Sequence, residues 1–277
     1  MELLQPSSLE ELDGGVFLAG GTDLVTLLRD GIVEADTLVD IRQVVPRGID
    51  GTRIGAGTTL AELEVEPQVP QVLREACAQA ASLQLRSMGT IGGNLLQATR
   101  CWYWRLGFDC WLHGGERCFA KDGAHREHAI FGNEQCASAH PSDIAAALVA
   151  LDATLRTTNR ELPIAELYRL PTEDDRDVTT LAPDELILEI DVTTPDASTY
   201  LKAMDRRKWA FPIVGVAAAR FGSEIRIALA GVAPIPWLLD STAALENATP
   251  LPGTAYKVEI ARALVRRAVD AIKSGSR

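Results

Sequence analysis

The sequence has no apolar run long enough to cross a membrane as a helix. Its longest, IAAALVAL at residues 144–151, falls far short of the ~20 residues that such a helix requires. Nor does it have an excess of positive charge, since the formal net charge is −11. A nucleic acid or an anionic membrane is therefore not expected as a partner. The start of the chain, MELLQPSSLEELDGG, lacks the basic and apolar regions of a signal peptide, so we expect a cytoplasmic location.

Several motifs that would define an enzyme class are also missing. There is no G-x-G-x-x-G fingerprint, no P-loop with its lysine, no H-E-x-x-H and no Ser/His/Asp pattern, so no catalytic residue is assigned. The paired C-x2–4-C knuckles of zinc ribbons and fingers are absent, as are the C-x2-C runs of ferredoxins. No repeat of solenoid period and no low-complexity tract occurs.

The sequence does have the apolar content of a globular fold. It is 47 % hydrophobic over 277 residues, which is typical of about two domains with a buried core. Residues 15–41 predict strand, glycine turn, helix and strand, and 52–63 predict a strand and a short capped helix. Further helices are expected at 71–83, 144–151 and 256–273, and strands at 185–192, 211–221 and 224–239. The acidic stretch 170–185 is the predicted boundary between a first α/β part and a second α+β part.

Two glycine loops stand out in the first part. LAGGTDL at 18–24 and GTIGGNL at 89–95 each place a glycine pair beside Thr and Asp or Asn. Glycine reaches positive φ without strain, so successive backbone N–H groups can form a nest for an anion such as a diphosphate. A helix N-terminus after each loop would add positive partial charge. Two ordinary tight turns remain an equally open interpretation of these residues.

Four of the five cysteines lie in or at the edge of one irregular segment, about 98–139. The spacing is Cys101-x8-Cys110-x7-Cys118-x17-Cys136. In a reducing compartment, clustered thiols more often bind metal or do chemistry than form disulfides. By spacing alone, a metal centre and a set of buried unpaired thiols both remain open, although a long loop without its own core needs something to offset its ordering entropy. Cys77, on the predicted helix 71–83, is expected to be a buried, inert thiol. Loop hydrogen bonding is the expected role of His113, His125, His128 and His140.

The segments LAGGTDL and RSMGTIGGNLL resemble the paired FAD-binding loops of the molybdenum hydroxylase family, in the flavin (medium) subunit of its xanthine dehydrogenase and aldehyde dehydrogenase types. HPSDIAAALVALDA (140–153) and YLKAMDRRKWAFPIVGVAA (200–218) are similar to further landmarks of the family. The resemblance implies an α+β fold, with a two-subdomain FAD-binding domain of the PCMH/VAO type and a smaller α+β C-terminal domain of the CO dehydrogenase flavoprotein type. It places the FAD-binding domain at 1–170, with subdomains at about 1–50 and 51–170, and the C-terminal domain at 183–277.

The same resemblance implies which residues hold FAD. The two loops would hold the pyrophosphate and nearby flavin atoms, and Asp143 would lie near the ribityl or adenosine end. Residues on a later strand and Lys202 would lie near the isoalloxazine ring. The implied set is Leu18, Ala19, Gly20, Gly21, Thr22, Asp23, Leu24, Thr90, Ile91, Gly92, Gly93, Asn94, Asp143, Ile187, Leu188 and Lys202.

Most members of the family run directly from the second glycine loop to the PSD segment, whereas here some forty residues intervene. This insert resembles those of the flavin subunits of 4-hydroxybenzoyl-CoA reductase and of the bacterial periplasmic-type aldehyde oxidoreductase. The resemblance implies an extra [4Fe–4S] cluster held by Cys101, Cys110, Cys118 and Cys136. The segment CWLHGGERC departs from the pattern, being shorter and less proline-rich. The periplasmic relative also keeps export within a folded complex open as an alternative location.

The resemblance therefore predicts an electron-transfer flavoprotein subunit. A molybdopterin-containing large subunit would oxidise the substrate, and a small subunit with [2Fe–2S] clusters would pass the electrons to the FAD of this chain. Two alternatives stay open: a self-contained FAD-dependent oxidase or dehydrogenase, and a structural zinc module without flavin. The substrate and the final electron acceptor (NAD, ferredoxin, a quinone or oxygen) are not predicted.

Overall fold

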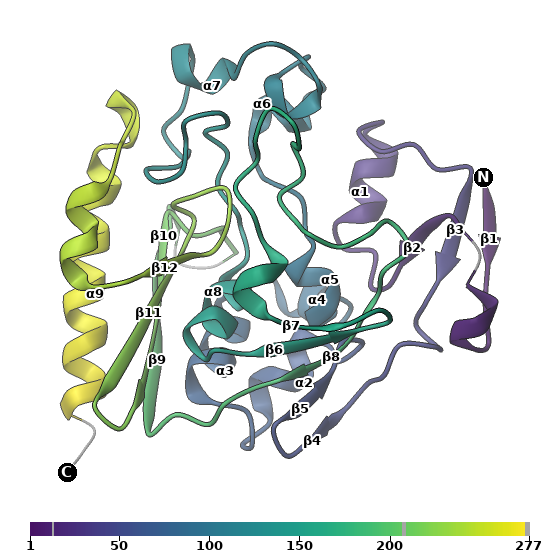
Figure 1. The fold of residues 1–277 in the computed structure, drawn as a ribbon, viewed down its shortest axis with the longest axis horizontal. Coiled ribbons are helices and arrows are strands. Elements are labelled where there is room, and N and C mark those ends of the chain that lie inside the picture. Colours follow the sequence, from purple (N-terminus) through teal and green to yellow (C-terminus); the bar gives the residue numbers. More distant parts are fainter. Residues whose placement is uncertain (13, 207–208, 275–277) are drawn as a thin grey trace.

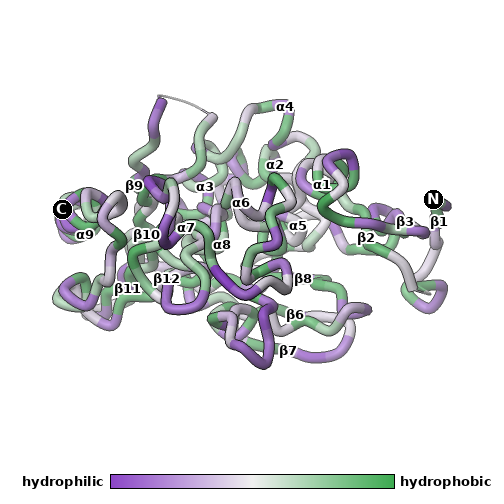
Figure 2. The backbone as a smooth tube through the Cα atoms, turned by 90° about the horizontal axis from the view of Figure 1, so that it is seen from above, coloured by the Kyte–Doolittle hydropathy of each residue, from purple (hydrophilic) through white to green (hydrophobic). Residues whose placement is uncertain are grey.

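The computed structural model describes residues 1–12, 14–206 and 209–274, so that Arg207 and Lys208 of the 200–218 segment lie outside the described residues. The described chain forms three sheets that follow one another across the molecule (Figure 1). Seen from above, the N-terminal strands lie at one end and the last helix at the other (Figure 2). This mixture of sheets and helices confirms the predicted α+β class.

The first sheet is small and parallel, with the order β1-β3-β2. The short helix α1 follows β2 directly after the first glycine loop. This arrangement confirms the strand, turn, helix and strand predicted for 15–41. The bounds are β1 (Glu2–Leu4), β2 (Val16–Leu18), α1 (Leu24–Arg29) and β3 (Thr37–Asp40).

The middle sheet is antiparallel and has the order β4-β5-β8-β6-β7. Its bounds are β4 (Ile49–Asp50), β5 (Arg53–Gly55), β6 (Thr154–Thr157), β7 (Glu161–Pro163) and β8 (Ile187–Asp191). Strand β8 follows the predicted boundary at 170–185, yet it pairs with β5 and β6 of the first part. A division of the chain at 183 therefore separates β8 from the sheet in which it lies.

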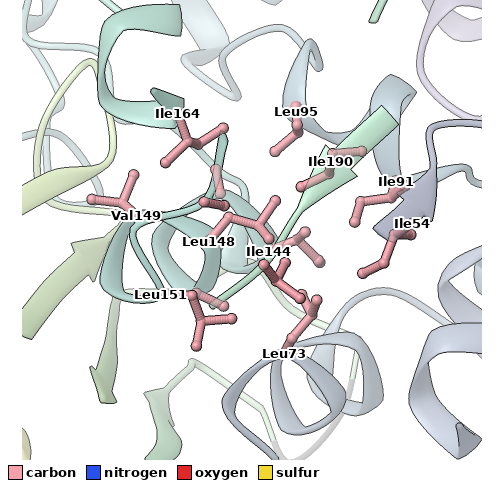
Figure 3. Close-up of a cluster of buried hydrophobic side chains, with 14 of the residues drawn as sticks. Ile54, Leu73, Ile91, Leu95, Ile144, Leu148, Val149, Leu151, Ile164 and Ile190 are labelled. Atoms are coloured by element: carbon pink, nitrogen blue, oxygen red, sulfur yellow. The ribbon is translucent and has the colours of Figure 1, made fainter. Parts of the chain in front are cut away.

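Helices α2, α3, α4, α5 and α8 pack beside the middle sheet (Figure 1). Every residue of α8 is buried, so the apolar run of 144–151 is a core helix. Figure 3 shows Ile144, Leu148 and Val149 of α8 among side chains of the neighbouring elements. The bounds are α2 (Leu60–Val65), α3 (Gln71–Gln79), α4 (Leu83–Arg86), α5 (Ile91–Leu95) and α8 (Asp143–Ala150).

The helix predicted for 71–83 ends earlier than expected, at Gln79. The chain turns through Ala81, whose φ is +47°, and Ser82 then caps α4 by accepting the N–H of Leu85. The prediction for 52–63 is confirmed. Thr59 caps α2 in a capping box with Glu62, each side chain bonding the other's backbone N–H.

The third sheet is antiparallel, with the order β12-β11-β10-β9. Its strands alternate between two cores: Ala217 and Ala228 face the core around α8, whereas Val216 and Leu229 face α9. The bounds are β9 (Ala197–Ala203), β10 (Val214–Phe221), β11 (Glu224–Ala230), β12 (Trp237–Leu239) and α9 (Tyr256–Ser274). Because α3 and α8 cover one face of this sheet and α9 the other, the C-terminal part packs tightly onto the first part.

The cysteine segment at 98–139 lies above these layers in Figure 1 and contains short helical turns that its composition did not predict. They are α6 (Trp102–Arg105), η2 (Trp111–His113) and α7 (Phe119–Asp122). Lys257 of α9 holds part of this insert in place through hydrogen bonds. Its buried Nζ donates to the carbonyls of Glu127, His128 and Gly231 over 2.7, 2.9 and 2.8 Å. Burial lowers the pKa of Lys257 to about 7.

None of the helices in the described part of the chain has the length and apolar character needed to span a membrane.

Candidate cofactor site

A cleft of about 630 Å³ opens between the first sheet and the helices beside the middle sheet. Both glycine loops line it, which brings together residues that are about seventy positions apart in the chain. The implied FAD residues that line the cleft are Ala19, Gly20, Gly21, Thr22, Asp23, Leu24, Thr90, Gly92, Gly93, Asn94, Asp143 and Ile187. Leu18, Ile91, Leu188 and Lys202 are not among the described residues that line it.

The two loops touch each other because Gly20 has no side chain. A Cβ at this position would lie 1.9 Å from the carbonyl oxygen of Met88, which precedes the second loop. The N–H of Leu60 also bonds the carbonyl of Gly89 over 3.0 Å and fixes the second loop onto α2. Glycine at position 20 is therefore required by close packing of the loops themselves.

The first loop offers free backbone donors to the cleft. Gly21 has a φ of +67°, the left-handed region that glycine adopts without strain. Among the described residues, no protein acceptor takes the N–H of Gly20, Gly21 or Thr22. Adjacent unpaired N–H groups at a turn of this kind can bind an anion through partial positive charge.

The second loop differs, because its N–H groups are already bonded within the protein. Ile91 and Gly92 donate to the carbonyls of Thr58 and Ala56, and Gly93 donates to the Thr90 hydroxyl that caps α5. A Cβ on Gly92 would lie 3.0 Å from the Cβ of Ala56, so this glycine serves close packing. The second loop therefore presents side chains and closely packed backbone to the cleft, and not unpaired N–H groups.

Asp23 lines the cleft and also has three partners within the protein. Its carboxylate forms ion pairs of 2.9 Å with Arg100 and with Arg105, and it accepts the N–H of Ala98 over 2.8 Å. All three partners lie at the start of the cysteine insert. Burial lowers the pKa of Arg100 to about 10, and the guanidinium lies 4.4 Å from the centre of the Phe211 ring. Asp23 therefore connects the first glycine loop to the insert.

Asp143 and Lys202 form a buried ion pair at the inner wall of the cleft. The Nζ of Lys202 lies 2.7 Å from Asp143 Oδ2 and also donates to the carbonyl of Gln79 over 3.0 Å. The Tyr200 hydroxyl donates to the other carboxylate oxygen. The side chains of Lys202 and Asp143 are 0 % and 3 % exposed, and burial raises the pKa of Asp143 despite the lysine.

Several lining residues were not assigned to the site from the sequence. Arg100, Arg206, Trp209 and Phe211 border the cleft, as does the positive-φ turn at Ala81. They come from the insert, from the segment after β9 and from the turn between α3 and α4. Only the folded chain brings these distant segments together, and no motif links them.

The four clustered cysteines line one small pocket in the insert, together with the aromatic rings of Tyr103, Trp104, Trp111 and Phe119. Its volume is about 10 Å³, roughly the room of one water molecule. The Cys101 Sγ lies 3.2 Å from His128 Nε2, and burial raises the pKa of Cys101 to about 11. The hydrogen bond from Cys136 lowers the pKa of Cys118. Within the described ranges, no three His, Cys, Asp or Glu side chains are grouped to hold a single metal ion.

The predictions for Cys77, His113 and His125 are confirmed. Cys77 is fully buried in the core, and burial raises its pKa. His113 and His125 bond loop carbonyls through Nδ1, to Phe108 over 3.1 Å and to Ala120 over 2.8 Å.

Paired glycine loops meet at one cleft on an α+β fold of three sheets, an arrangement that suits a nucleotide cofactor of the flavin class. Residues 4–195 match the family described as the FAD binding domain in molybdopterin dehydrogenase. The chain belongs to this family, which supports FAD as its cofactor and confirms the predicted resemblance.

Relatives and solved structures agree with this assignment. The aldehyde oxidoreductase FAD-binding subunit PaoB of Escherichia coli (strain K12) is 34 % identical, over 84 % of this chain and 80 % of that protein. The nicotinate dehydrogenase FAD-subunit of Eubacterium barkeri is 25 % identical, over 77 % of this chain and 66 % of that protein. The fold matches a chain of carbon monoxide dehydrogenase from Hydrogenophaga pseudoflava, with a TM-score of 0.70 at 22 % identity over 99 % of this chain and 97 % of that chain. The chain is thus homologous to FAD subunits of molybdenum hydroxylase complexes, which are oxidoreductases.

Proposed function

We propose that this chain is the electron-transfer flavoprotein subunit of a molybdenum hydroxylase that oxidises aldehydes. The observation that carries the proposal is the 34 % identity to an aldehyde oxidoreductase FAD-binding subunit, combined with a cleft that both glycine loops line. Bound FAD would accept electrons singly and pass them on in pairs, which is the chemistry that an amino-acid side chain does not supply.

The residues of the cleft fit this cofactor. The free N–H groups of Gly20, Gly21 and Thr22 suit the diphosphate, which explains how a chain of net charge −11 can bind it without a lysine. The Thr22 and Thr90 hydroxyls supply further polar groups at the same wall. Asp143 contacts the cofactor directly in this proposal, whereas Lys202 acts through Asp143 as a positioning residue. Ile187 borders the cleft, and Leu188 supports it from β8.

We propose further that the insert holds a [4Fe–4S] cluster through Cys101, Cys110, Cys118 and Cys136. The convergence of all four thiols on one aromatic-walled pocket supports this assignment. A tetrahedral zinc site would hold its sulfur atoms only about 4 Å apart, given Zn–S bonds of about 2.3 Å. In a cubane each thiolate binds a different iron, so the sulfurs stand farther apart.

The partners and location follow from the same proposal. A molybdopterin-containing large subunit and a [2Fe–2S] small subunit would complete the complex, with an obligate interface above ~2,000 Å². The complex would be cytoplasmic, or periplasmic if it is exported as a folded assembly. We assign the FAD-binding part to residues 1–170 together with β8, and the C-terminal part to the third sheet and α9.

Three measurements test the proposal. Acid precipitation should release FAD, and anaerobically prepared protein should contain about four iron and four sulfide per chain. Cys110→Ser should lower that iron content, whereas the buried Cys77→Ser should leave it unchanged. The isolated subunit should not oxidise aldehydes with a dye acceptor until the molybdenum subunit is added. Turnover without molybdenum would instead identify a self-contained flavoenzyme, and zinc without sulfide or flavin would identify a structural module.

A further inference from the structure

The side chain of Asn94, in the second glycine loop, is bonded to the protein at only one of its two polar atoms. Its Oδ1 lies 2.6 Å from the hydroxyl oxygen of Ser142, while its Nδ2 makes no hydrogen bond with the described part of the chain. Asn94 is half-buried and lines the cleft. Its Nδ2 is not among the unpaired side-chain nitrogens that are buried from solvent in the described residues, so a ligand in the cleft can reach it.

The contact with Ser142 identifies which end of the amide faces the protein. A distance of 2.6 Å is usual between an O–H donor and an oxygen acceptor, whereas an N–H donor and an oxygen usually lie about 2.7–3.2 Å apart. The Ser142 hydroxyl has a single hydrogen, and its oxygen already accepts the N–H of Ala145 over 2.9 Å. The hydroxyl therefore donates its hydrogen to Asn94 Oδ1, and the NH2 group is the end of the amide that stays free.

Ser142 is itself fixed in the core, so it can impose this orientation. It is 1 % exposed and caps α8, a helix in which every residue is buried. Its own N–H donates to the Nδ1 of His140 over 3.4 Å, and the N–H of His140 donates to the carbonyl of Ala233 over 2.7 Å. Ser142 is not among the described residues that line the cleft. Its hydroxyl therefore acts on the cleft through Asn94.

We propose that Ser142 is a positioning residue for the cofactor, which holds the Asn94 amide so that its NH2 group faces the cleft and donates to an acceptor atom of FAD. The inference rests on the proposed function, because FAD is the ligand. The diphosphate oxygens and the ring carbonyls of FAD are acceptors with no hydrogen of their own. An NH2 group can bond them, whereas the carbonyl end of the same amide would repel them.

Asparagine needs such a partner because the two ends of its amide are nearly equal in size. An amide that rotated freely would present Oδ1 to the cleft as readily as Nδ2, and fixing it on binding would cost conformational entropy. A second residue that orients it beforehand removes that cost. The N–H groups of Ile91, Gly92 and Gly93 are already bonded, so this side chain supplies donors that the backbone there does not.

The test compares variants by the Kd of FAD, measured by calorimetry on the full chain after its flavin has been removed. Ser142→Ala and Ser142→Gly both remove the hydroxyl, but glycine is nearly as good as serine at the start of a helix, and alanine is much poorer. The two variants therefore differ in the stability of α8 and share the loss of the bond to Asn94.

Ser198→Ala is the matched control. Ser198 is also buried, and its hydroxyl oxygen accepts the N–H of Val72, in the first turn of α3, over 3.2 Å. It is not among the described residues that line the cleft. The control should therefore unfold at a lower denaturant concentration than the wild type and bind FAD with an unchanged Kd.

We expect Ser142→Ala and Ser142→Gly to raise the Kd of FAD equally, by about fivefold, and Asn94→Ala to raise it about tenfold, because each change weakens one hydrogen bond to the cofactor. Adding Ser142→Ala to Asn94→Ala should raise the Kd no further, whereas independent effects would multiply to about fiftyfold. Asn94→Asp keeps the shape of the side chain but replaces the NH2 group with an acceptor, so it should bind FAD more weakly than Asn94→Ala does.

The inference is overturned if the single effects multiply in the double variant, if Ser142→Gly keeps the wild-type Kd, or if Asn94→Asp binds FAD as well as the wild type. The last result would mean that Oδ1 of Asn94 faces the cofactor. Circular dichroism checks that each variant is folded, and Ser142→Gly replaces Ser142→Ala in the double variant if the alanine variant is not. Wild-type protein that binds no FAD would instead refute the proposed function.

Discussion

The ion pair of Lys202 and Asp143 gives the sharpest test of how the cleft is built. The resemblance alone placed Lys202 beside the isoalloxazine ring, but in the structure its Nζ is occupied by Asp143 Oδ2 at 2.7 Å and the Gln79 carbonyl at 3.0 Å. Both charged side chains are buried, at 0 % and 3 % exposed. Lys202→Met removes one charge and leaves the carboxylate buried without its partner.

Breaking a buried ion pair on one side costs about 3–5 kcal/mol, because the remaining charge keeps its desolvation penalty. We therefore expect Lys202→Met to lower the free energy of unfolding by that amount. Asp143→Asn should cost less, since its amide oxygen can still accept the Tyr200 hydroxyl and Lys202 keeps the Gln79 carbonyl. The double variant carries no uncompensated charge, so its cost should fall below the sum of the two single costs by about 2 kcal/mol or more.

Guanidinium unfolding of the four proteins at saturating FAD, followed by circular dichroism, measures this cycle. The absorption spectrum and the reduction potential of the bound flavin are recorded in parallel. An unfolding cost below about 1 kcal/mol for Lys202→Met, together with a shifted flavin potential, would refute the reasoning. That outcome would mean that the lysine contacts the flavin itself and that its pairing with Asp143 contributes little.

Three further predictions follow from single residues. Gly21→Ala and Gly31→Ala should each lower the free energy of unfolding by about 1 kcal/mol, because the φ values of these glycines are +67° and +68°. Only Gly21 lines the cleft, so only Gly21→Ala should weaken FAD binding tenfold or more, as measured by calorimetry. Burial lowers the pKa of His140 to about 4 from 6.5. The stability that neutral His140 contributes is therefore present above pH 6.5 and is lost as the pH falls toward 4. Unfolding curves recorded over this pH range should show a smaller loss for His140→Phe. The guanidinium of Arg42 lowers the pKa of Asp40 to about 2. Asp40→Asn should therefore be less stable than the wild type above pH 4. The free energies of unfolding of the two proteins should converge as the pH falls toward 2.

The elements that the sequence predicted well are those with strong local signals. The capping box at Thr59 and Glu62 fixes the start of α2 within the six residues around it. The apolar run 144–151 was predicted as a helix, and α8 covers Asp143–Ala150. Each of the two glycine loops can also be recognised locally, from a glycine pair beside Thr and Asp or Asn. Their joint role in binding FAD was implied only by the family resemblance.

What the sequence could not predict depends on partners far along the chain. Strand β8 (Ile187–Asp191) pairs with β5 (Arg53–Gly55) and β6 (Thr154–Thr157), both far back along the chain, and no local pattern specifies that pairing. The N–H groups of the second loop look as free as those of the first until Thr58 and Ala56 are placed beside them. Arg100 was not assigned to the site from the sequence, yet it borders the cleft.

Asp23 shows why the insert and the FAD cleft are best regarded as one unit. Its carboxylate is held by Arg100, Arg105 and the N–H of Ala98, so the first glycine loop and the start of the insert fix each other. If the insert were disordered, Asp23 would stand unpaired beside the free N–H groups of the loop and would compete with the phosphate for them. An ordered insert neutralises that carboxylate and keeps the donors available. In the proposed site, binding of FAD and ordering of the cysteine insert would therefore favour each other, through contacts that a chain without the insert would have to replace.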